Sequence, residues 1–463
     1  MVARFAGFSR RPRWLAFFFL LLCGSAFVFS AEKKVSFLNF ADVAETLRLF
    51  ADSGLPGSNI ADAAAWDRWI REQDAQVRAR IDRGVEDSIS NLILYGTYYT
   101  NLPRMESAEG SVTDAGKISD GAQARVRALS AAVSAATPNE RVRIVRDFLA
   151  RKGIAREKVP QFLTENLERF ALEQRDYQKK LEEAGNTGDP GQVMLTRGTL
   201  YQTRGLSADT SLLPNYALED SLRVMANKGV LAPGKIRRIA VIGPGLDFTD
   251  KRDGYDFYPL QTIQPFAVME AVLRLKLGKA EEIEVVTLDL NPGVNAHVAK
   301  LAKDARAGRT YAVQLPRDTG ADWSPAAVAY WAHFGEILGT PAKPIPVPQA
   351  LGGVTLRAVA IAPRYAARVT PVDLNVVTQR MELEEGQGFD LVIATNILVY
   401  YDRFQQGLAM ASIARMMNPG GIFMANNALP AQHAEALEFL GRRTVAYATN
   451  ESYGDDVVVY RRR

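Results

Sequence analysis

Glycine and acidic side chains stand at the ends of two predicted strands in the second half of the chain. Ile236 to Ile242 is apolar after its leading arginine pair and leads directly into Gly243-Pro244-Gly245. Glycine at a strand end lets the backbone turn and approach a ligand closely. Glu282 to Asp289 is a second strand pattern, and its final carboxylate can accept hydrogen bonds from two adjacent hydroxyl groups, such as those of a ribose. Alternatively, Asp289 caps the helix that follows.

The glycine turn does not fit a dinucleotide site. Such sites carry a third glycine three residues further on, where this chain has Phe248. The separation of Gly243 from Asp289 is also longer than usual, and the polar and aromatic segment Thr249 to Thr262 accounts for the excess. A nicotinamide-dependent oxidoreductase is therefore a weak hypothesis, and the segment is a candidate wall of a substrate pocket.

Strand and helix patterns alternate from about Lys235 to the end of the chain. Phe389 to Asp402, "FDLVIATNILVYYD", reads as a buried strand and a turn, and an amphipathic helix follows it. "NPGG", at Asn418 to Gly421, reads as a structural turn into another strand. This alternation predicts an α/β fold with a Rossmann-like doubly wound sheet.

The preceding residues predict an all-α N-terminal domain. Apolar positions recur at helical spacing, and the helix before Gly153 is expected to begin with Thr137 as its cap and Glu140 completing a capping box. The polar patch of Tyr201, Arg204, Ser207 and Asp209 follows, either in a simple connector or in a lid over a pocket. We expect a helical domain at 32–184, a linker or lid at 185–235 and the Rossmann-like domain at 236–463.

In this order, the segments resemble the CheR-type methyltransferases, class I enzymes that use S-adenosylmethionine. The resemblance covers roughly residues 235–427. Its most specific piece is Phe389 to Asp402, and the others are "QPFA" at Gln264 to Ala267, "LDLN" at Leu288 to Asn291 and "VDLNVV" at Val372 to Val377.

The resemblance implies a set of cofactor-binding residues. Asp289 would hold the ribose, while Asp373 and Asn375 would lie along the adenine. Asn396 and Ile397 would line the pocket near the methionine moiety. The whole implied set is Gly243, Pro244, Gly245, Gln264, Asp289, Leu290, Asp373, Leu374, Asn375, Asn396 and Ile397.

Two residues depart from the family pattern. Gln264 stands where the family has an acid that helps bind the amino-acid end of the cofactor, and Thr395 replaces the arginine before Asn396. No chemotaxis-type acceptor-binding subdomain can be recognised, so the receptor substrate of that family is not carried over. The methyl acceptor is unknown.

Methyl transfer from a sulfonium needs alignment of donor and acceptor more than acid–base catalysis. The absence of a catalytic triad is consequently compatible with this reaction. The candidate catalytic residues are Asn396 and Tyr400, although Tyr400 and its neighbour Tyr401 can equally be packing residues. Arg204 and Tyr255 are further candidates on the acceptor side.

The first 31 residues have the layout of a signal peptide or a membrane anchor. Four arginines precede an apolar run from Trp14 to about Phe29, and Val28 and Ser30 suit a cut before Ala31. The run of about eighteen residues at 14–31 is also borderline for spanning a membrane. Either interpretation predicts export of the remainder to the periplasm or outside the cell, or its anchoring to the inner membrane.

The charge and composition of the chain limit the classes of molecule that it is expected to bind. The four leading arginines account for the whole net charge of +4, so the remainder is neutral, which argues against a general nucleic-acid binder. Membrane contact is expected only through the N-terminal segment. The single cysteine, Cys23, lies in the apolar run, and the three histidines lack ligand spacing, so no metal site is predicted.

Two hypotheses from different classes remain. The first is an S-adenosylmethionine-dependent methyltransferase of CheR-like type. This hypothesis must explain how the cofactor reaches the protein, because S-adenosylmethionine is made in the cytoplasm while the N-terminus predicts export. The second is an exported, catalytically inactive Rossmann-like binding or scaffold protein, whose helical domain binds a protein partner.

Overall fold

The computed structural model divides the chain into two compact units, residues 1–33 and 34–463. The structure describes residues 34–186, 201–202, 204–249, 255–426, 429, 436–449 and 453–463. The predicted leader at 1–31, with its apolar run at 14–31, lies outside the described residues. Among the helices of the described ranges, none is both long enough and apolar enough to cross a membrane.

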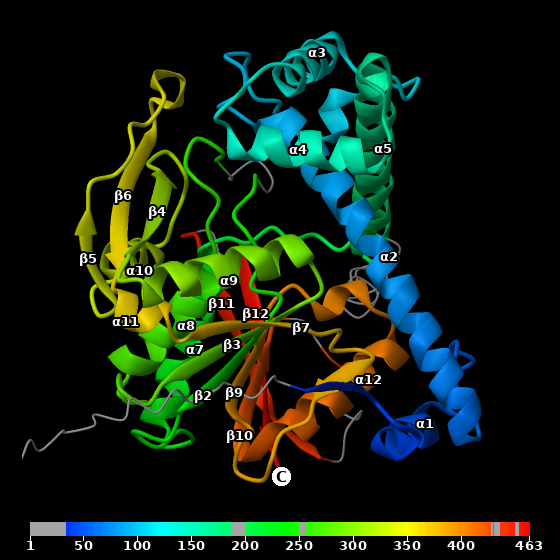
Figure 1. Ribbon diagram of the computed structural model, residues 1–463, viewed down its shortest axis with the longest axis vertical. Helices are drawn as coiled ribbons and strands as arrows, with labels where there is room; N and C mark the ends of the chain where they lie inside the picture. The colour runs from blue at the N-terminus through cyan, green and yellow to red at the C-terminus, as the bar shows by residue number, and fades with distance from the viewer. Residues whose placement is uncertain are drawn as a thin grey trace, which may run out of the picture. The chain divides into compact units, whose positions relative to one another are not determined.

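A seven-stranded sheet forms the centre of the second unit (Figure 1). Its order is β11-β12-β10-β9-β2-β3-β7, and only β12 runs against its neighbours. The chain winds outward first from β2 to β7 and then from β9 to β10, so its direction reverses between β2 and β9. The predicted doubly wound α/β fold is confirmed. The strands are β2 (Arg238–Ile242), β3 (Glu284–Asp289), β7 (Val369–Asp373), β9 (Phe389–Ala394), β10 (Met417–Ala425), β11 (Leu437–Ala446) and β12 (Gly454–Arg462).

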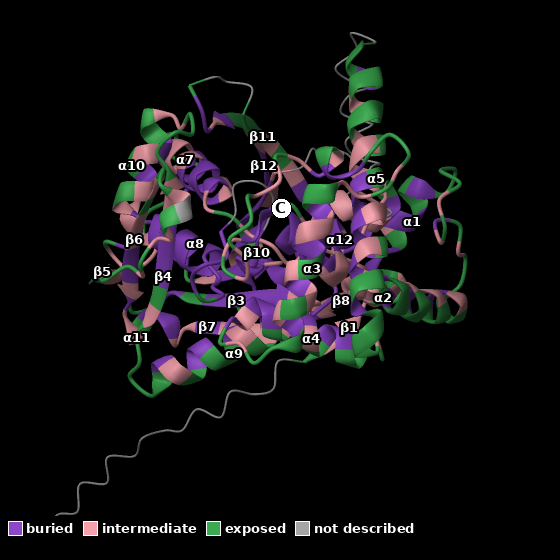
Figure 2. Cartoon of the chain, turned by 90° about the horizontal axis from the view of Figure 1, so that it is seen from above, coloured by how far each residue is buried: buried purple, intermediate pink, exposed green. Residues whose placement is uncertain are grey.

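Helices cover both faces of this sheet, as the apolar pattern of its strands requires. Ile239 and Val241 of β2 join one core cluster, whereas Ala240 and Ile242 join the other. A strand that is buried on both faces reads as a continuous apolar run. The buried residues accordingly fill the interior between the helices in Figure 2. The first cluster includes residues of α7 (Leu213–Asn227), α8 (Gln264–Arg274) and α9 (Pro292–Arg306), and the second includes residues of α1 (Ala44–Phe50), α2 (Ala63–Tyr95) and α12 (Arg403–Met416).

The long helix α2 belongs to two parts of the fold. Trp66, Ile70 and Val77 in its first half pack with the sheet, whereas Ile89 and Leu92 in its second half pack with the N-terminal helices. Figure 1 shows α2 running between these two groups. Those helices are α3 (Asp120–Ser134), α4 (Glu140–Arg151) and α5 (Val159–Asn186).

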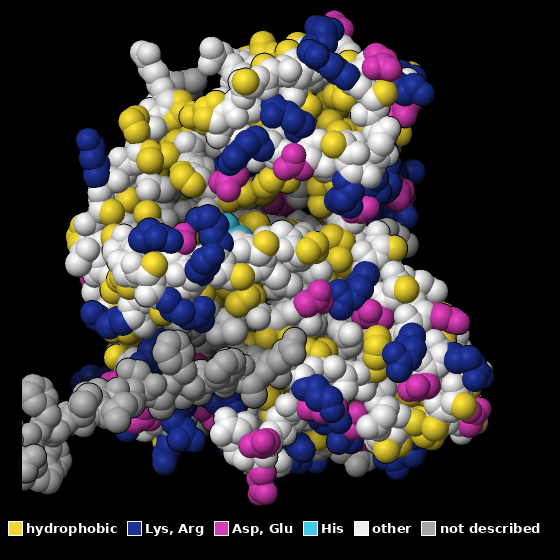
Figure 3. Space-filling model, in the orientation of Figure 1, with side chains coloured by type: hydrophobic (Ala, Val, Ile, Leu, Met, Phe, Trp, Pro, Cys, Tyr) yellow, Lys and Arg dark blue, Asp and Glu magenta, His cyan; other side chains and the backbone are white. Residues whose placement is uncertain are grey.

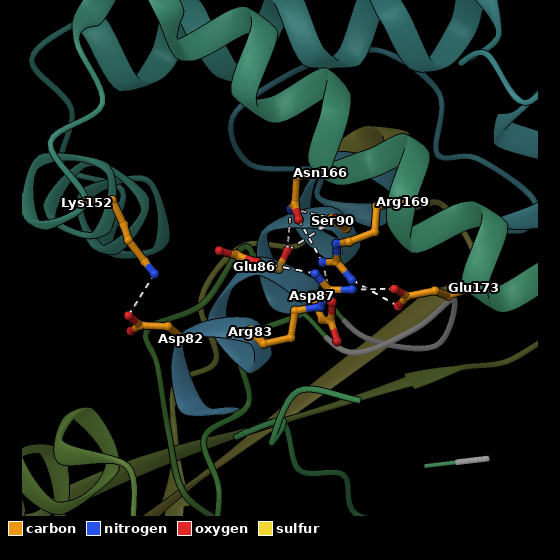
Figure 4. Close-up of polar contacts among 9 residues, drawn as sticks. All are labelled: Asp82, Arg83, Glu86, Asp87, Ser90, Lys152, Asn166, Arg169 and Glu173. Atoms are coloured by element: carbon orange, nitrogen blue, oxygen red, sulfur yellow. Dashed lines mark hydrogen bonds and ion pairs between the residues drawn. The ribbon is translucent and has the colours of Figure 1, made fainter. Parts of the chain in front are cut away.

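Ion pairs and hydrogen bonds fasten α5 to α2 (Figure 4). Arg169 of α5 lies 2.6 Å from the Asp87 carboxylate of α2 and 3.0 Å from Glu173. Asn166 donates to the Glu86 carbonyl and to the Ser90 hydroxyl at 2.6 and 3.0 Å. Burial raises the pKa of Asp87 although Arg169 opposes the increase. Since α2 also packs on the sheet, these contacts connect the helices to the Rossmann-like part.

The predicted cap of α4 is wrong. Asn139, not Thr137, caps this helix, since its side chain accepts from the backbone N–H groups of Arg141 and Val142. Glu140 instead accepts a hydrogen bond from the backbone of Leu260 at 3.0 Å. Thr137 accepts from the Asn139 backbone and so supports the cap residue. The predicted end of the helix at Gly153 is confirmed, with φ of +68°.

Two small sheets also differ from the prediction. β1 (Val35–Phe37) lies within the region expected to be helical, and it pairs with β8 (Gln379–Met381). Between α9 and β7, the chain forms an antiparallel sheet in the order β4-β6-β5 instead of continuing the parallel alternation. These inserted elements are β4 (Tyr311–Asp318), α10 (Pro325–His333), β5 (Gly339–Ala342), β6 (Val354–Ile361) and α11 (Pro363–Ala366), and the short 3-10 helices of the described chain are Phe40–Asp42, Glu109–Ser111, Arg156–Lys158, Gln349–Leu351 and Leu398–Tyr400.

Candidate functional site

The predicted cofactor residues gather at the carboxyl edge of the central sheet. Ile242, which precedes Gly243, pairs with Leu288 in β3, and Asp289 pairs with Asp373 in β7. The glycine turn and both acidic strand ends therefore share one edge, beside the point where the chain reverses between β2 and β9. Ligands of open α/β sheets bind in the crevice at this position.

The backbone at the glycine turn has a conformation that favours glycine. Gly243 and Gly245 have φ of +63° and +66°, with Pro244 between them. A Cβ on Gly243 would collide with the Ile397 side chain, and one on Gly245 would lie 2.5 Å from the Ala208 carbonyl oxygen. The turn is therefore held between the loop after β9 and the segment that precedes α7.

Asp289 is a half-buried carboxylate at the end of β3. Burial is the main reason that its pKa is raised, to about 7, and the nearby Asp373 carboxylate adds to the increase. The backbone N–H groups of Asn291, Leu290 and Gly245 oppose it, and the Asn291 N–H donates to Asp289 Oδ1 at 2.7 Å. Asn291, not Asp289, caps α9 by accepting from the Gly293 backbone at 2.8 Å. The capping alternative for Asp289 is thus excluded.

The residues after β7 divide between the surface and the core. Asp373 is 57% exposed in its side chain and lies 2.8 Å from Arg78 of α2. Leu374 is buried, and the Asn375 side chain has internal partners at both ends, donating to Asp74 at 2.9 Å and accepting from the Val377 backbone at 3.1 Å. Of these side chains, Asp373 is the one offered to a ligand, while Asn375 ties the loop to α2.

The two departures from the family pattern face each other. The Gln264 side chain, only 2% exposed at the start of α8, donates to the Thr395 hydroxyl at 2.7 Å. A neutral pair at this position needs no buried counter-charge, which is costly to desolvate. The replacement of an acid by glutamine and of an arginine by threonine is therefore mutually consistent.

Asn396 lies at the same edge in a left-handed conformation, with φ of +57°. Its backbone N–H donates to Asn426 Oδ1 at 2.6 Å, and its own Oδ1 accepts from Asn426 Nδ2 at 2.9 Å. Asn426 Nδ2 also donates to Asp455 at 3.2 Å, and Tyr447 donates to the same Asp455 oxygen at 2.6 Å. These bonds hold the Asn396 side-chain oxygen, and the residue itself is exposed. The sequence analysis missed Asn426 and Asp455, because only the pairing of β10 with β12 brings them together.

Tyr400 and Tyr401 lie in different environments. Tyr400 is half-buried, and its ring centroid lies 5.8 Å from that of Tyr201. Tyr401 is 3% exposed, and burial raises its pKa above the usual range, as expected for a packing residue. Tyr255 is buried in a cluster with Phe257 and Tyr258 that packs against the inserted sheet, so these three residues have a packing role there.

The described part of the linker lies against the glycine turn. The Leu246 N–H donates to the Ala208 carbonyl at 2.6 Å, and Asp209 forms a bridge with Leu246. Asp209 accepts from Ser88 of α2 and from Ser207 at 3.1 and 3.0 Å. The segment is therefore anchored both to α2 and to the predicted cofactor loop.

No metal site is evident in the described ranges, where no three His, Cys, Asp or Glu side chains are grouped to hold an ion. His297 contacts the Tyr311 hydroxyl at 2.9 Å instead. On the face drawn in Figure 3, acidic and basic side chains are interspersed.

The sheet order and the residues at its carboxyl edge define a Rossmann-like protein with a candidate nucleoside site. No family model and no curated protein matches the chain. Among solved structures, it is similar to the N-methyltransferase NodS from Bradyrhizobium japonicum WM9 at 12% identity, over 53% of this chain and 97% of that one, with a TM-score of 0.26. It is also similar to the magnesium protoporphyrin IX methyltransferase ChlM from Synechocystis PCC 6803 with bound SAM, at 12% identity over 71% of this chain and 99% of that one, with a TM-score of 0.26. For the methyltransferase CcbJ from Streptomyces caelestis, the identity is 12% over 54% of this chain and 96% of that one, with a TM-score of 0.27. Similarities of this size carry no argument about function, so the function has to be inferred from the residues of the site.

Proposed function

We propose that this chain is an S-adenosylmethionine-dependent methyltransferase. The observation that carries the proposal is the meeting of Gly243, Asp289 and Asp373 at one sheet edge, beside the reversal of strand order. A glycine turn that admits a ligand near the backbone and a carboxylate suited to ribose hydroxyls match a nucleoside cofactor. The third glycine of a dinucleotide site is absent, which favours a ligand without a pyrophosphate.

Each part of such a cofactor has a candidate binding residue at this edge of the sheet. Asp289 would accept hydrogen bonds from the ribose hydroxyls, and Asp373 would lie further along the edge, toward the adenine. Gln264 and Thr395 would bind the amino-acid end through neutral groups. The cofactor supplies an activated methyl group, so the protein has to align donor and acceptor and exclude water.

The CheR-like type of the proposed enzyme is supported by the loop after β9. The resemblance assigns Asn396 and Ile397 to the methionine end of the cofactor, and the closeness of Ile397 to Gly243 supports this assignment. Tyr400 follows one turn later, at the border with the segment 201–212. We propose that Asn396 and Tyr400 contact the acceptor. The neutral Gln264–Thr395 pair distinguishes this chain from the family pattern.

Calorimetric titration of the full chain with S-adenosylhomocysteine tests the proposal. Asp289→Ala should weaken binding by roughly 1 to 3 kcal/mol, because the ribose hydroxyls lose their acceptor. Asp304→Ala is the matched control, since this carboxylate of α9 lies outside the proposed site and pairs with Lys300 and Arg309, and unchanged binding is expected. Absence of heat at millimolar ligand would favour the alternative, a scaffold protein without turnover.

A further inference from the structure

Three tyrosines from separate parts of the chain form a cluster beside the candidate site. Tyr177 comes from α5, Tyr201 from the segment before α7, and Tyr400 from the loop after β9. The ring centroids of Tyr177 and Tyr201 lie 5.5 Å apart, and those of Tyr201 and Tyr400 lie 5.8 Å apart, both edge to face. All three side chains are half-buried, so the cluster reaches the surface.

The guanidinium of Arg204 lies on this cluster, and no carboxylate of the described residues pairs with it. Its central carbon is 5.2 Å from the ring centroids of both Tyr177 and Tyr201. One of its terminal nitrogens is buried and has no hydrogen-bond partner among these residues. Cation–π contacts stabilise a guanidinium on an aromatic ring, but a buried N–H donor without a hydrogen-bond partner is destabilising, and more so when it is charged. The tyrosine rings thus contact the Arg204 guanidinium but leave one of its N–H donors without a hydrogen-bond acceptor among the described residues.

A second arginine increases the positive potential at this place. Arg80 of α2 donates to the backbone carbonyls of Tyr201, Arg204 and Tyr400, at 2.8 to 3.3 Å. Burial lowers its pKa, and within the described ranges it has carbonyl groups rather than a carboxylate as partners. Arg80 therefore binds the backbone of the residues that carry the cluster, and no described carboxylate forms an ion pair with Arg80 or Arg204.

The cluster adjoins the cofactor edge through Tyr401. The Arg80 guanidinium lies 5.9 Å from the centroid of the Tyr401 ring. Tyr401 belongs to the same buried cluster as Ile242, Leu288 and Leu374, which adjoin the predicted cofactor residues at the strand ends. An anion bound at Arg204 would consequently lie on the acceptor side of the proposed cofactor site.

We propose that Arg204, held on the rings of Tyr177 and Tyr201, binds an anionic group of the methyl acceptor. The acceptor would then carry a carboxylate or a phosphate close to the methylated atom, and an aromatic or flat apolar part would suit the tyrosine rings. A guanidinium recognises both anions through paired N–H donors. This inference rests on the proposed function for its meaning, but the anion site itself can be tested separately.

The experiment measures binding of simple anions to the full chain by calorimetry, with and without saturating S-adenosylhomocysteine. Benzoate and phenyl phosphate are the two probes, and benzamide is the neutral match. We expect an anionic probe to bind, benzamide to bind at least tenfold more weakly, and Arg204→Gln to weaken the anion at least tenfold. Arg204→Lys keeps the charge and should lose less, which gives a second test if the glutamine variant fails to fold. If benzoate binds more tightly than phenyl phosphate, the acceptor carries a carboxylate; if phenyl phosphate binds more tightly, the acceptor carries a phosphate.

Arg317→Gln is the matched control. Arg317 also stacks on an aromatic ring, 5.0 Å from the centroid of Trp331, and its Nε is likewise buried without a hydrogen-bond partner among the described residues. It lies in the inserted sheet, so its loss should leave probe binding unchanged. Equal affinity of the wild type and Arg204→Gln for both anions, or no anion binding at all, overturns the inference. Arg204-dependent anion binding without S-adenosylhomocysteine binding would keep the anion site and refute the proposed cofactor.

Discussion

At the scale of single residues, Asp289 connects the fold to a measurable pH dependence. Its pKa is raised to about 7, chiefly by burial. For a carboxyl group with a raised folded-state pKa, the contribution to stability is full below the unfolded pKa near 4 and is lost as pH rises through 7. Donors from a bound ribose would stabilise the ionised form and so offset this loss.

We therefore predict that S-adenosylhomocysteine binds more tightly as pH rises from 5 to 7 and that the affinity levels off above about pH 7.5. The ionised carboxylate is the form that accepts two hydroxyl hydrogen bonds, so each pH unit below 7 should reduce affinity up to about tenfold. Calorimetry across this range measures the slope. Asp289→Asn should remove most of it, and an unchanged slope in that variant would assign the titration to another group.

The sequence predicted the residues of the site that lie at strand ends better than those that support them. Gly243, Asp289 and Asp373 follow apolar runs, so their place at one edge follows from a parallel sheet. Arg80 and Asn426 have no such local signal, because their partners lie far along the chain or arrive on another strand. Asn375 looked like a ligand contact, yet its side chain serves the packing of α2 against the loop.

At the scale of elements, α2 and the segment before α7 cross at close range. A Cβ on Gly84 would collide with the Leu206 carbonyl group, and one on Gly205 would collide with the backbone N–H of Gly84. The Leu206 N–H donates to the Arg80 carbonyl at 3.1 Å. The glycines therefore allow α2 to hold the segment that contacts the Gly243–Gly245 turn.

We predict that Gly84→Ala weakens S-adenosylhomocysteine binding at least fivefold and lowers the melting temperature. Replacing glycine by alanine inside a helix normally stabilises the helix by about 1 kcal/mol. A lower melting temperature of Gly84→Ala would therefore indicate that the added Cβ collides with Leu206. Calorimetry and thermal unfolding measure the two effects. Gly185→Ala in α5 is the control, because nothing lies within 4 Å of the added Cβ. A stabilised Gly84→Ala protein with normal affinity would show that the segment does not press on α2.

Helix ends and small sheets were the least predictable elements. The spacing of Thr137 and Glu140 matched a capping box, but Glu140 has a tertiary partner in Leu260, and Asn139 took the cap instead. The strand patterns of β4 and β6 gave no sign of whether they would enter the main sheet. β6 pairs with β4 and also packs on Tyr255, Phe257 and Tyr258, and no local pattern encodes these long-range contacts.

At the scale of the whole molecule, the alternation of strand and helix patterns predicts a doubly wound sheet, and the structure has one. The order of its strands was not part of that prediction. The connection of the helical region to the sheet could not be predicted, since α2 divides its apolar residues between two cores.

The proposed export of the chain is the last prediction. Arg4, Arg10, Arg11 and Arg13 precede the apolar run, and positive residues stay on the cytoplasmic side, so the chain after Lys34 should be translocated. Alkaline phosphatase fused after Lys34 should then be active in a bacterial host, and deletion of residues 2–31 should abolish that activity. Activity independent of the leader would contradict export. Translocation would place the Asp289 site where cytoplasmic S-adenosylmethionine does not reach it unaided, so adenosine should then be titrated beside S-adenosylhomocysteine: preference for adenosine would indicate a nucleoside-binding protein rather than a methyltransferase.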